Sequence, residues 1–257
     1  EKTVLLTDRT FDFYLNTMPA LDKTAMAACQ LRIDNLAKPI YSLGYLEQIA
    51  VELAGILADE RPEKDIRRAL LCFTGPELSP AQKQLTLAFA EHANAEVTIA
   101  HLRYDRTPNE AFDFGRRTAE DITLSSPILG IALTETKPSD PCNSKRTALR
   151  QALCTEDGSL RYSADNFLQH VPAPLQTDVA ALMGAMIAAA HNNALIILDN
   201  EATEIIAQYT EKLCPGIKPY LLHTQPNLLH LAMTAGGGGI ACLGMKVVDA
   251  ALHMLND

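Results

Sequence analysis

Residues 195–223 read LIILDNEATEIIAQYTEKLCPGIKPYLLH, and this stretch decides the fold. It holds two short apolar runs, 195–198 and 220–223, on either side of an amphipathic segment, 201–214, that has the length and spacing of a helix. Two strands joined through a helix lie parallel in one sheet, with a right-handed crossover. The stretch therefore predicts one strand–helix–strand unit of a parallel α/β sheet.

The same alternation extends in both directions from this unit. Three further apolar runs predict buried strands at 69–73, 97–102 and 128–133. Amphipathic segments predict helices at 80–94, 109–124, 177–192 and 240–255. Ser79 followed by Pro80 is a clear helix start, because the hydroxyl can cap the helix and proline suits its first position. The fold class is therefore α/β with a parallel sheet.

The first third of the chain has a helical pattern without strands. Pro39 breaks the chain, and Ser42 is placed to N-cap the helix that follows. Apolar residues then recur at steps of three and four as one stripe: Leu43, Leu46, Ala50, Leu53 and Leu57. The charged group 59–68 is expected to be a solvated boundary, and the proline-containing stretch 134–144 a loop after a strand.

The composition limits the classes of function. A net charge of −9 argues against a nucleic-acid-binding surface, which needs clustered basic residues. No apolar run approaches the roughly 20 residues of a membrane span, so we expect neither nucleic acid nor membrane as a partner. The cysteines are scattered, as in reduced cytoplasmic proteins: Cys29, Cys72, Cys142, Cys154, Cys214 and Cys242.

Four consecutive glycines precede the last predicted helix: Gly236, Gly237, Gly238 and Gly239. Glycine allows a close backbone approach to a ligand, and the free amides of a helix N-terminus favour a phosphate or carboxylate. The run therefore predicts a phosphate-binding turn. A flexible connection without a ligand explains the same residues equally well.

Polar residues follow the last two predicted strands. Asp199 ends one strand and could reach a ligand-binding edge, as could Asn200; His223 ends the next strand. His230 follows His223 by seven residues, a spacing that does not fit a helical zinc site, so we expect no metal. Among the other acidic candidates, Asp178 has no assigned role. Glu201 and Glu204 are expected in the first turn of a helix, where they complement its dipole.

Two blocks of sequence resemble the nicotinate-nucleotide:dimethylbenzimidazole phosphoribosyltransferase family. Residues 33–47, IDNLAKPIYSLGYLE, are similar to the family's (I/L)DxLxKPxGSLGxLE, with Tyr41 in place of glycine. Residues 178–185, DVAALMGA, resemble EIAALAGA, and residues 197–200, ILDN, resemble LLDG. His223 and His230 keep the spacing of the family's SHxSxExGH.

This resemblance implies a doubly wound, Rossmann-like parallel sheet with a small helical subdomain built from the chain termini. The expected parts are a helical segment 1–60, an α/β core 61–235, and the glycine loop with the closing helix, 236–257. The family transfers phosphoribose from nicotinate mononucleotide to an aromatic base without a cofactor, in cobamide lower-ligand activation. Its members are usually dimers, so the resemblance implies a homodimer or a heterodimer with a paralogue.

The chain departs from the family at the site itself. The family's general base is the glutamate of GEGxGA, and Gly236 stands at that position, so no catalytic residue is assigned. Residues 132–137, ALTETK, replace the nucleotide-binding GEMGIGNT, and residues 74–76, TGP, replace DHG. Gln225 and Asn227 stand where serine and glutamate are expected. Ser79 keeps the place of the family's base-site serine.

Two main hypotheses follow. The chain is a divergent phosphoribosyltransferase-like protein with lost or altered activity, or a non-catalytic homologue that binds a ligand or partners an active paralogue. An unrelated small-molecule activity on the same fold is a third hypothesis. For ligand and phosphate binding the sequence points to the four glycines, Ser79, Asp199 and His223, and the expected ligand is a nucleotide or an aromatic base.

Overall fold

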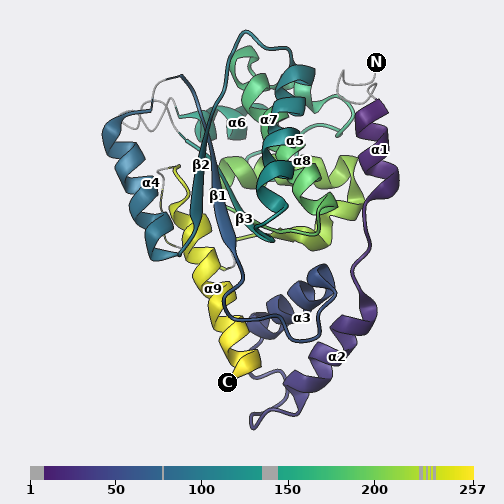
Figure 1. Ribbon diagram of the computed structural model, residues 1–257. Helices are drawn as coiled ribbons and strands as arrows, with labels where there is room; N and C mark the ends of the chain where they lie inside the picture. Colours follow the sequence, from purple (N-terminus) through teal and green to yellow (C-terminus); the bar gives the residue numbers. More distant parts are fainter. Residues whose placement is uncertain are drawn as a thin grey trace.

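The computed structural model describes residues 9–76, 78–134, 144–225, 228–229, 231, 233 and 236–257, with the backbone alone for residues 9 and 10. Five parallel strands form one sheet in the order β2-β1-β3-β4-β5 (Figure 1). They are β1 (Arg68–Thr74), β2 (Glu96–His101), β3 (Ile128–Leu133), β4 (Leu195–Leu198) and β5 (Leu221–Leu222). The parallel α/β sheet predicted from the sequence is confirmed.

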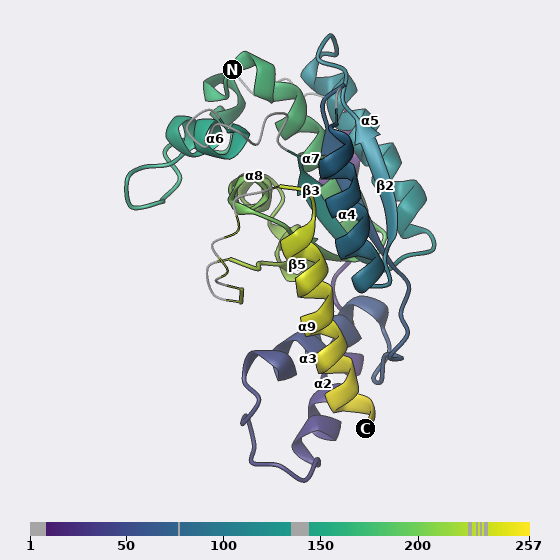
Figure 2. The same cartoon turned by 90° about the vertical axis from the view of Figure 1, so that its left-hand side faces the viewer.

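Helices cover both faces of the sheet (Figures 1 and 2). One face carries α5 (Pro108–Thr123), α7 (Ala173–His191) and α8 (Glu201–Leu213); the other carries α4 (Pro80–His92) and α9 (Gly239–Asn256). The split follows from right-handed crossovers, because the chain moves from β1 outward to β2 and then back past β1 to β3. The sheet is therefore doubly wound, as the family resemblance implied.

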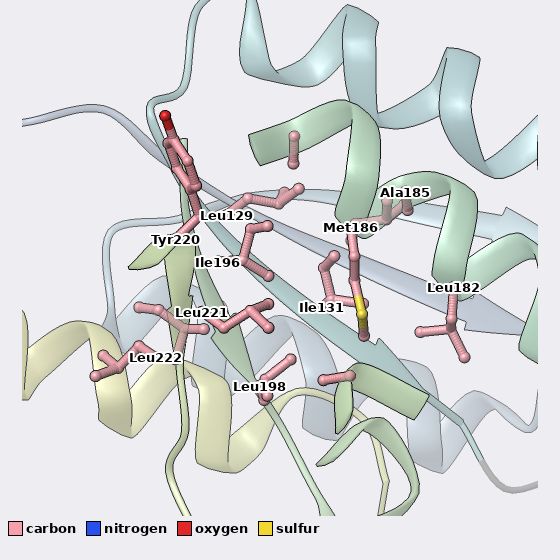
Figure 3. Packing of buried hydrophobic residues seen from close by; sticks show 14 of the residues in the cluster. Leu129, Ile131, Leu182, Ala185, Met186, Ile196, Leu198, Tyr220, Leu221 and Leu222 are labelled. Atoms are coloured by element: carbon pink, nitrogen blue, oxygen red, sulfur yellow. The ribbon is translucent and has the colours of Figure 1, made fainter. Parts of the chain in front are cut away.

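The core extends over both faces of the sheet, and one large part of it lies between the sheet and α7. Every residue of β1, β3 and β4 is buried, which is usual for a parallel sheet covered on both faces. Figure 3 shows Leu129 and Ile131 of β3 and Ile196 of β4 among the side chains packed near Leu182 and Met186 of α7. These contacts fix the positions of the strand ends.

The expectation of a buried strand at 97–102 is wrong in its burial. Within β2 only Ala100 is buried, and both end residues, Glu96 and His101, are exposed. The physical reason is that β2 is an edge strand and pairs with β1 alone. The predicted strand at 220–223 is also shorter, because Tyr220 belongs to the 3-10 helix η4 (Pro215–Tyr220).

Helix α7 is long and apolar enough by composition to cross a membrane, and it is the one such helix among the described residues. Within the protein 83% of its apolar stretch is buried. It contacts β3, β4, α5 and α8. Its hydropathy is that of a core helix.

A small helical part lies beyond the amino ends of the strands (Figure 1). It consists of α2 (Lys23–Asp34), α3 (Tyr45–Leu57) and the C-terminal half of α9. The Nε of Arg32 donates to the carbonyl of Leu255 at 3.1 Å, and the Nδ2 of Asn256 donates to the carbonyl of Pro62 at 2.9 Å. Helix α9 thus extends from the sheet into the small part and joins the two.

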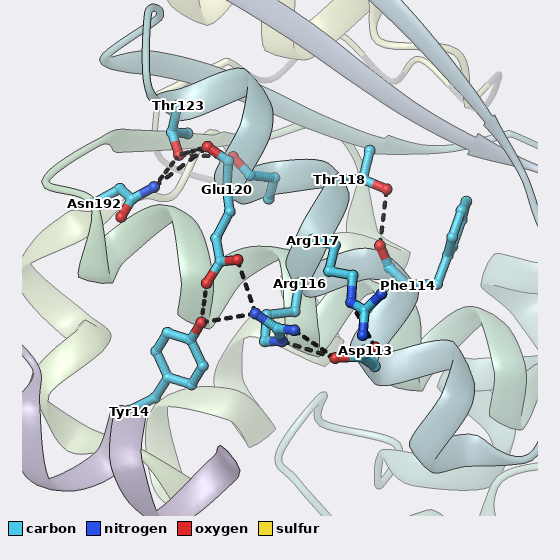
Figure 4. Close-up of polar contacts among 10 residues, drawn as sticks. Tyr14, Asp113, Phe114, Arg116, Arg117, Thr118, Glu120, Thr123 and Asn192 are labelled. Carbon is cyan, nitrogen blue, oxygen red and sulfur yellow. Dashed lines mark hydrogen bonds and ion pairs between the residues drawn. The ribbon is translucent and has the colours of Figure 1, made fainter.

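Helix α1 (Arg9–Thr17) packs against the α/β part and not against α2 and α3 (Figure 1). The Tyr14 hydroxyl donates to the Glu120 carboxylate, and the Nη1 of Arg116 donates to the same hydroxyl at 3.2 Å (Figure 4). Arg116 also pairs with Asp113 at 2.6 Å and with Glu120 at 2.8 Å. This network holds α1 on the surface formed by α5 and α7.

The prediction that Ser42 caps a helix is wrong. Helix α3 begins at Tyr45, its N-cap position is Gly44, and no side chain caps it. The turn before it is closed by Glu47, whose Oε1 accepts from the amide of Leu43 at 3.0 Å and from Lys38 at 2.7 Å. The Glu47 carboxylate thus closes the turn before the helix, whereas the amides of the first helical turn receive no side-chain cap.

Two further elements complete the fold. Helix α6 (Lys145–Leu153), which the sequence did not predict, starts after Ser144, whose Oγ accepts from the amide of Thr147. The 3-10 helix η3 (Phe167–His170) precedes α7. The five described cysteines are free and buried: Cys29, Cys72, Cys154, Cys214 and Cys242. Burial raises the pKa of Cys29 to about 11 and that of Cys242 to about 12.

Candidate functional site

The candidate site lies at the carboxyl edge of the sheet, where β1 and β3 end side by side. From β1 the chain continues outward to β2, and from β3 it continues in the opposite direction to β4. The helices that follow β1 and β3 therefore lie on opposite faces of the sheet. Open α/β sheets bind ligands outside the strand ends at such a switch point. Thr74 and Thr134 stand there, and the amide of Thr134 donates to the carbonyl of Phe73 at 2.8 Å.

Three buried polar atoms at this edge lack a hydrogen-bond partner among the residues described. They are the Oγ1 atoms of Thr74 and Thr134 and the Nδ2 of Asn200. These residues are at most 2% exposed. A buried polar group without a partner costs about 1–3 kcal/mol. We therefore expect a polar ligand or bound water to satisfy them.

Asp199 is buried at the end of β4 and occupies the N-terminus of α9. Its carboxylate accepts hydrogen bonds from four backbone amides, at 3.0 to 3.4 Å: Gly237, Gly238, Ile240 and Ala241. Burial raises the pKa of Asp199, and the four amides offset only part of that rise. The protein therefore supplies its own carboxylate at the helix end where an anion would bind.

This arrangement bears directly on the predicted phosphate-binding turn. The amides of Gly237 and Gly238 point at Asp199, so a phosphate could reach them only after that carboxylate moved. A phosphate placed beside Asp199 would also meet a like charge in a buried setting. The assignment of the four glycines to phosphate stays a prediction, whereas their contact with Asp199 is a feature of the fold.

Gly236 stands where the family resemblance places the catalytic glutamate. A Cβ atom at this position would lie much closer than 3.0 Å to the carbonyl oxygen of Leu133, and at 3.2 Å from the Nδ2 of Asn200. Backbone cannot yield as a side-chain tip can, so no side chain fits at this position. The turn is built around glycine.

Ser79 is confirmed as the start of a helix. Its Oγ accepts from the amide of Gln82 at 3.2 Å, and the Gln82 side chain returns to Ser79 in a capping box. The hydroxyl also lies 3.0 Å from the Oε1 of Gln82. Ligand binding by Ser79 stays a prediction, and it would compete with this cap.

His223 is joined to a buried carboxylate. Its Nδ1 lies 2.6 Å from the Oε2 of Glu204, whose Oε1 accepts from the amides of Thr224 at 2.9 Å and Gln225 at 3.2 Å. Glu204 raises the pKa of His223, and burial offsets part of the rise. Glu204 thus fastens the end of β5 to α8, a role beyond the expected contribution to the helix dipole. The position of His230 lies outside the described residues.

A second charged cluster was missed by the sequence reasoning. The Nζ of Lys145 donates to Asp178 at 2.8 Å and to the Tyr104 hydroxyl at 2.9 Å, and both charged residues are buried. Burial lowers the pKa of Lys145, but Asp178 and Tyr104 outweigh it, so the pKa is raised. Tyr104 follows β2, whereas Lys145 and Asp178 lie on α6 and α7, both between β3 and β4, and their spacing in the sequence does not encode this contact.

Within the described part of the chain, no group of three or more histidines, cysteines, aspartates or glutamates is placed to hold a metal ion. The acidic groups at this edge that could accept a proton are also engaged. Asp199 is held by four amides and Glu204 by two amides and His223. The two buried carboxylates at this edge, Asp199 and Glu204, are therefore engaged in hydrogen bonds within the protein.

Comparison with known proteins points to one family. A family model described as phosphoribosyltransferase matches residues 18–78. The nicotinate-nucleotide–dimethylbenzimidazole phosphoribosyltransferase of Photorhabdus laumondii is 25% identical, over 97% of this chain and 96% of its own. The protein of the same name from Escherichia coli K12 is 23% identical, over 95% of this chain and 92% of its own.

Solved structures share the fold. The crystal structure of the phosphoribosyltransferase from Thermus thermophilus superposes with a TM-score of 0.67 at 18% identity, covering 92% of this chain and 96% of that one. The alignment with the Photorhabdus protein spans 339 positions, although this chain has 257 residues. Relatives therefore carry internal segments that are absent here.

Proposed function

Because this chain belongs to the nicotinate-nucleotide–dimethylbenzimidazole phosphoribosyltransferase family, we propose that it keeps a small-molecule site at the carboxyl edge and has lost or altered the family's reaction. The observation that carries the proposal is Gly236. At the place where the resemblance puts the general base there is no side chain, and the packing on Leu133 leaves no room for one. Proton abstraction needs a base within hydrogen-bond reach of its substrate.

The retained site suits a small polar ligand. Two buried hydroxyls, on Thr74 and Thr134, can donate or accept, and the Asn200 amide can donate. Ring nitrogens of an aromatic base or hydroxyls of a ribose complement these groups. This supports a nucleotide or an aromatic base as ligand, and it requires no cofactor.

Calorimetric titration tests the proposal, with nicotinate mononucleotide, ribose phosphates and several aromatic bases as ligands. We expect binding of at least one ligand, without nicotinate release when nicotinate mononucleotide and a base are supplied together. Chromatography of the reaction mixture measures that release. Turnover of nicotinate mononucleotide would contradict the loss of the reaction, and absence of any binding would contradict the retained site.

A conservative substitution tests whether the ligand binds at the carboxyl edge. Thr134→Val replaces an unpartnered hydroxyl by a methyl group of the same shape, so stability should be kept while ligand affinity falls. Thr210→Val is the matched control, because its hydroxyl donates to the carbonyl of Ile206 at 2.7 Å. Thr210→Val should be less stable than the wild type, and its folded fraction should bind the ligand with wild-type affinity. Equal affinity of Thr134→Val and the wild type would remove this hydroxyl from the site.

An exposed apolar surface supports a second candidate function, partnership with another subunit. Large apolar side chains of α2, of the turn before α3 and of the first residue of α3 are between 41% and 70% exposed: Leu31, Ile40, Tyr41, Leu43 and Tyr45. We infer a second copy of this chain or of a paralogue as the partner. Sedimentation of the purified chain, and of the chain co-expressed with a paralogue, tests this. A monomer in both experiments would contradict it.

We further propose that the protein works in the cytoplasm, because the five cysteines in the described part of the chain are buried, free thiols, as in proteins of a reducing compartment.

A further inference from the structure

A pocket of about 470 Å³ lies beside the carboxyl edge, between α6, the first residue of α8 and the turn at residues 154–161. We call it the arginine pocket. Its charged and polar lining includes Arg146, Arg150, Gln151, Thr155, Arg161 and Glu201. It is separate from the buried atoms of the candidate site, although Glu201 directly follows Asn200 in the chain.

The guanidinium groups of this pocket are held in place from two sides. Arg146 and Arg150 lie four residues apart on one face of α6, and both pair with Glu201. Arg161 comes from the other side, where its Nη2 donates to the carbonyl of Cys154 at 2.8 Å. Its own amide donates to the carbonyl of Leu153, also at 2.8 Å. Two anchored segments therefore point arginines into one space.

The charge of the pocket is opposite to that of the molecule. The chain has a net charge of −9, yet three arginines line this pocket against two glutamates, Glu156 and Glu201. A concave surface of one sign concentrates ions of the other sign. Guanidinium groups bind phosphate through paired, charge-assisted hydrogen bonds.

Asp199 removes the competing anion site. The amides at the start of α9 are already occupied by its carboxylate, so the helix end does not attract a phosphate. Glu201 occupies the arginine pocket less firmly than Asp199 occupies the helix end, because solvent reaches its ion pair. The Glu201 side chain is 30% exposed and that of Arg150 is 50% exposed. The greater charge of a phosphate dianion favours its exchange for this single, partly exposed carboxylate.

We propose that the arginine pocket binds the phosphate group of a phosphomonoester. The ligand is held by Arg150 and Arg161, with the side-chain amide of Gln151 in the same lining able to donate a further hydrogen bond. The proposal does not depend on the candidate site at the carboxyl edge. It assigns to this chain a phosphate position that the glycine turn does not provide.

Titration of the full chain with ribose 5-phosphate, inorganic phosphate and ribose tests the assignment. Ribose 5-phosphate should bind and ribose should not bind at this pocket; inorganic phosphate shows whether the anion alone suffices. Arg150→Gln and Arg161→Gln should each weaken the binding of ribose 5-phosphate by about tenfold or more, since each removes a charge-assisted contact. Arg67→Gln is the control, because this exposed arginine pairs with Glu96 at the opposite edge of the sheet.

A substitution of Glu201, the carboxylate that pairs with the pocket arginines, should increase the affinity for ribose 5-phosphate. Glu201→Gln removes the competing charge, so ribose 5-phosphate should bind more tightly than to the wild type. Circular dichroism verifies that each variant is folded. Unchanged affinity in both arginine variants, equal binding of ribose and ribose 5-phosphate, or weaker binding by Glu201→Gln would overturn the proposal. The two sites are tested separately by the binding of an aromatic base. If Thr134→Val loses this binding and Arg150→Gln keeps it, the carboxyl-edge site stands whether or not the arginine pocket binds phosphate.

Discussion

At the scale of single residues, Gly236, which the family resemblance places at the position of the catalytic glutamate, is fixed by its packing. Its Cα faces the carbonyl of Leu133 and the side chain of Asn200, in a space that excludes a Cβ atom. The neighbouring amides of Gly237 and Gly238 are fixed by Asp199. The backbone of the turn therefore excludes a carboxylate side chain at this position.

Gly236→Glu tests this view. The new side chain collides with backbone, so we expect a loss of about 3 kcal/mol in the free energy of unfolding. No nicotinate release should appear. Denaturant unfolding and the chromatographic assay measure the two quantities.

The control for this variant is Gly158→Glu, which adds the same charge in open space at a positive φ of 85°. It should lose only about 1 kcal/mol, the usual strain of a left-handed conformation. A Gly236→Glu protein as stable as this control, or one that released nicotinate, would contradict the packing argument.

Tyr41 carries backbone strain at another position that differs from the family pattern. Its φ is +59°, in the left-handed region that favours glycine, and glycine is the residue of the family segment. Its side chain is 70% exposed, so it gains little by packing. Tyr41→Gly should therefore raise the free energy of unfolding by about 1 kcal/mol.

Tyr41→Ala separates the backbone from the side chain, because alanine keeps the Cβ atom and hence the strain. We expect no gain in stability for this variant in the same denaturation measurement. A similar gain in both variants would assign the effect to the exposed ring.

At the scale of elements, the apolar runs located the strands well because β1, β3 and β4 are buried on both faces. The edge position of β2 was not readable from its own residues, since it depends on the order of all the strands. Helix α6 escaped prediction because only Lys145, Leu149 and Leu153 of its nine residues are buried, which is a weak apolar period. Ser42 was misassigned because Glu47, four residues after Leu43, satisfies the same turn.

The contact between α8 and β5 predicts a pH dependence. Glu204 raises the pKa of His223 above its ordinary 6.5, so the folded state holds the proton more tightly than the unfolded state. The resulting stabilisation is fully present below pH 6.5 and is lost as the pH rises through the folded-state pKa. The free energy of unfolding should therefore decrease over this window.

Glu204→Gln should abolish this part of the pH profile, because it removes the carboxylate that raises the pKa. The difference between the profiles of wild type and variant isolates the pair from other titrating groups. A difference that grows as the pH rises would have the wrong sign and would contradict the assignment. Nuclear magnetic resonance titration of the His223 ring measures the pKa directly.

At the scale of the whole molecule, α9 connects the sheet with the small helical part. Its first half contacts β3 and β4, and the helix also packs on α3 (Figure 2). Leu252 is fully buried near its end. Leu252→Ala should cost about 2–5 kcal/mol by creating a cavity. We expect one cooperative unfolding transition, with faster amide exchange in both α3 and β3.

Leu87→Ala on α4 is the control, since Leu87 is 43% exposed and its truncation should have little effect. Circular dichroism and hydrogen exchange measure the two variants. Exchange that accelerates in α3 alone would show that the small part opens independently, contrary to a connection through α9.

The candidate site could be predicted only where its residues follow strands. Asp199, Asn200 and His223 were found because strand ends meet at one edge of a parallel sheet. The partners of these residues come from distant segments, and sequence spacing does not encode the contact of Asp199 with the turn at residues 237–238. The arginine pocket was not predicted either, because Arg150 and Arg161 belong to different segments and only the fold brings them to one pocket.

The glycine packed on the Leu133 carbonyl also has a consequence for descent. Under the proposal that Gly236 replaces the family's glutamate, a single reversion to glutamate would carry a fold-destabilising clash with the carbonyl of Leu133. Backbone around Leu133 and Asn200 would have to rearrange first, with no benefit until the glutamate arrived. Under that proposal the change acts as an evolutionary ratchet, because reversal requires the backbone to change before the side chain.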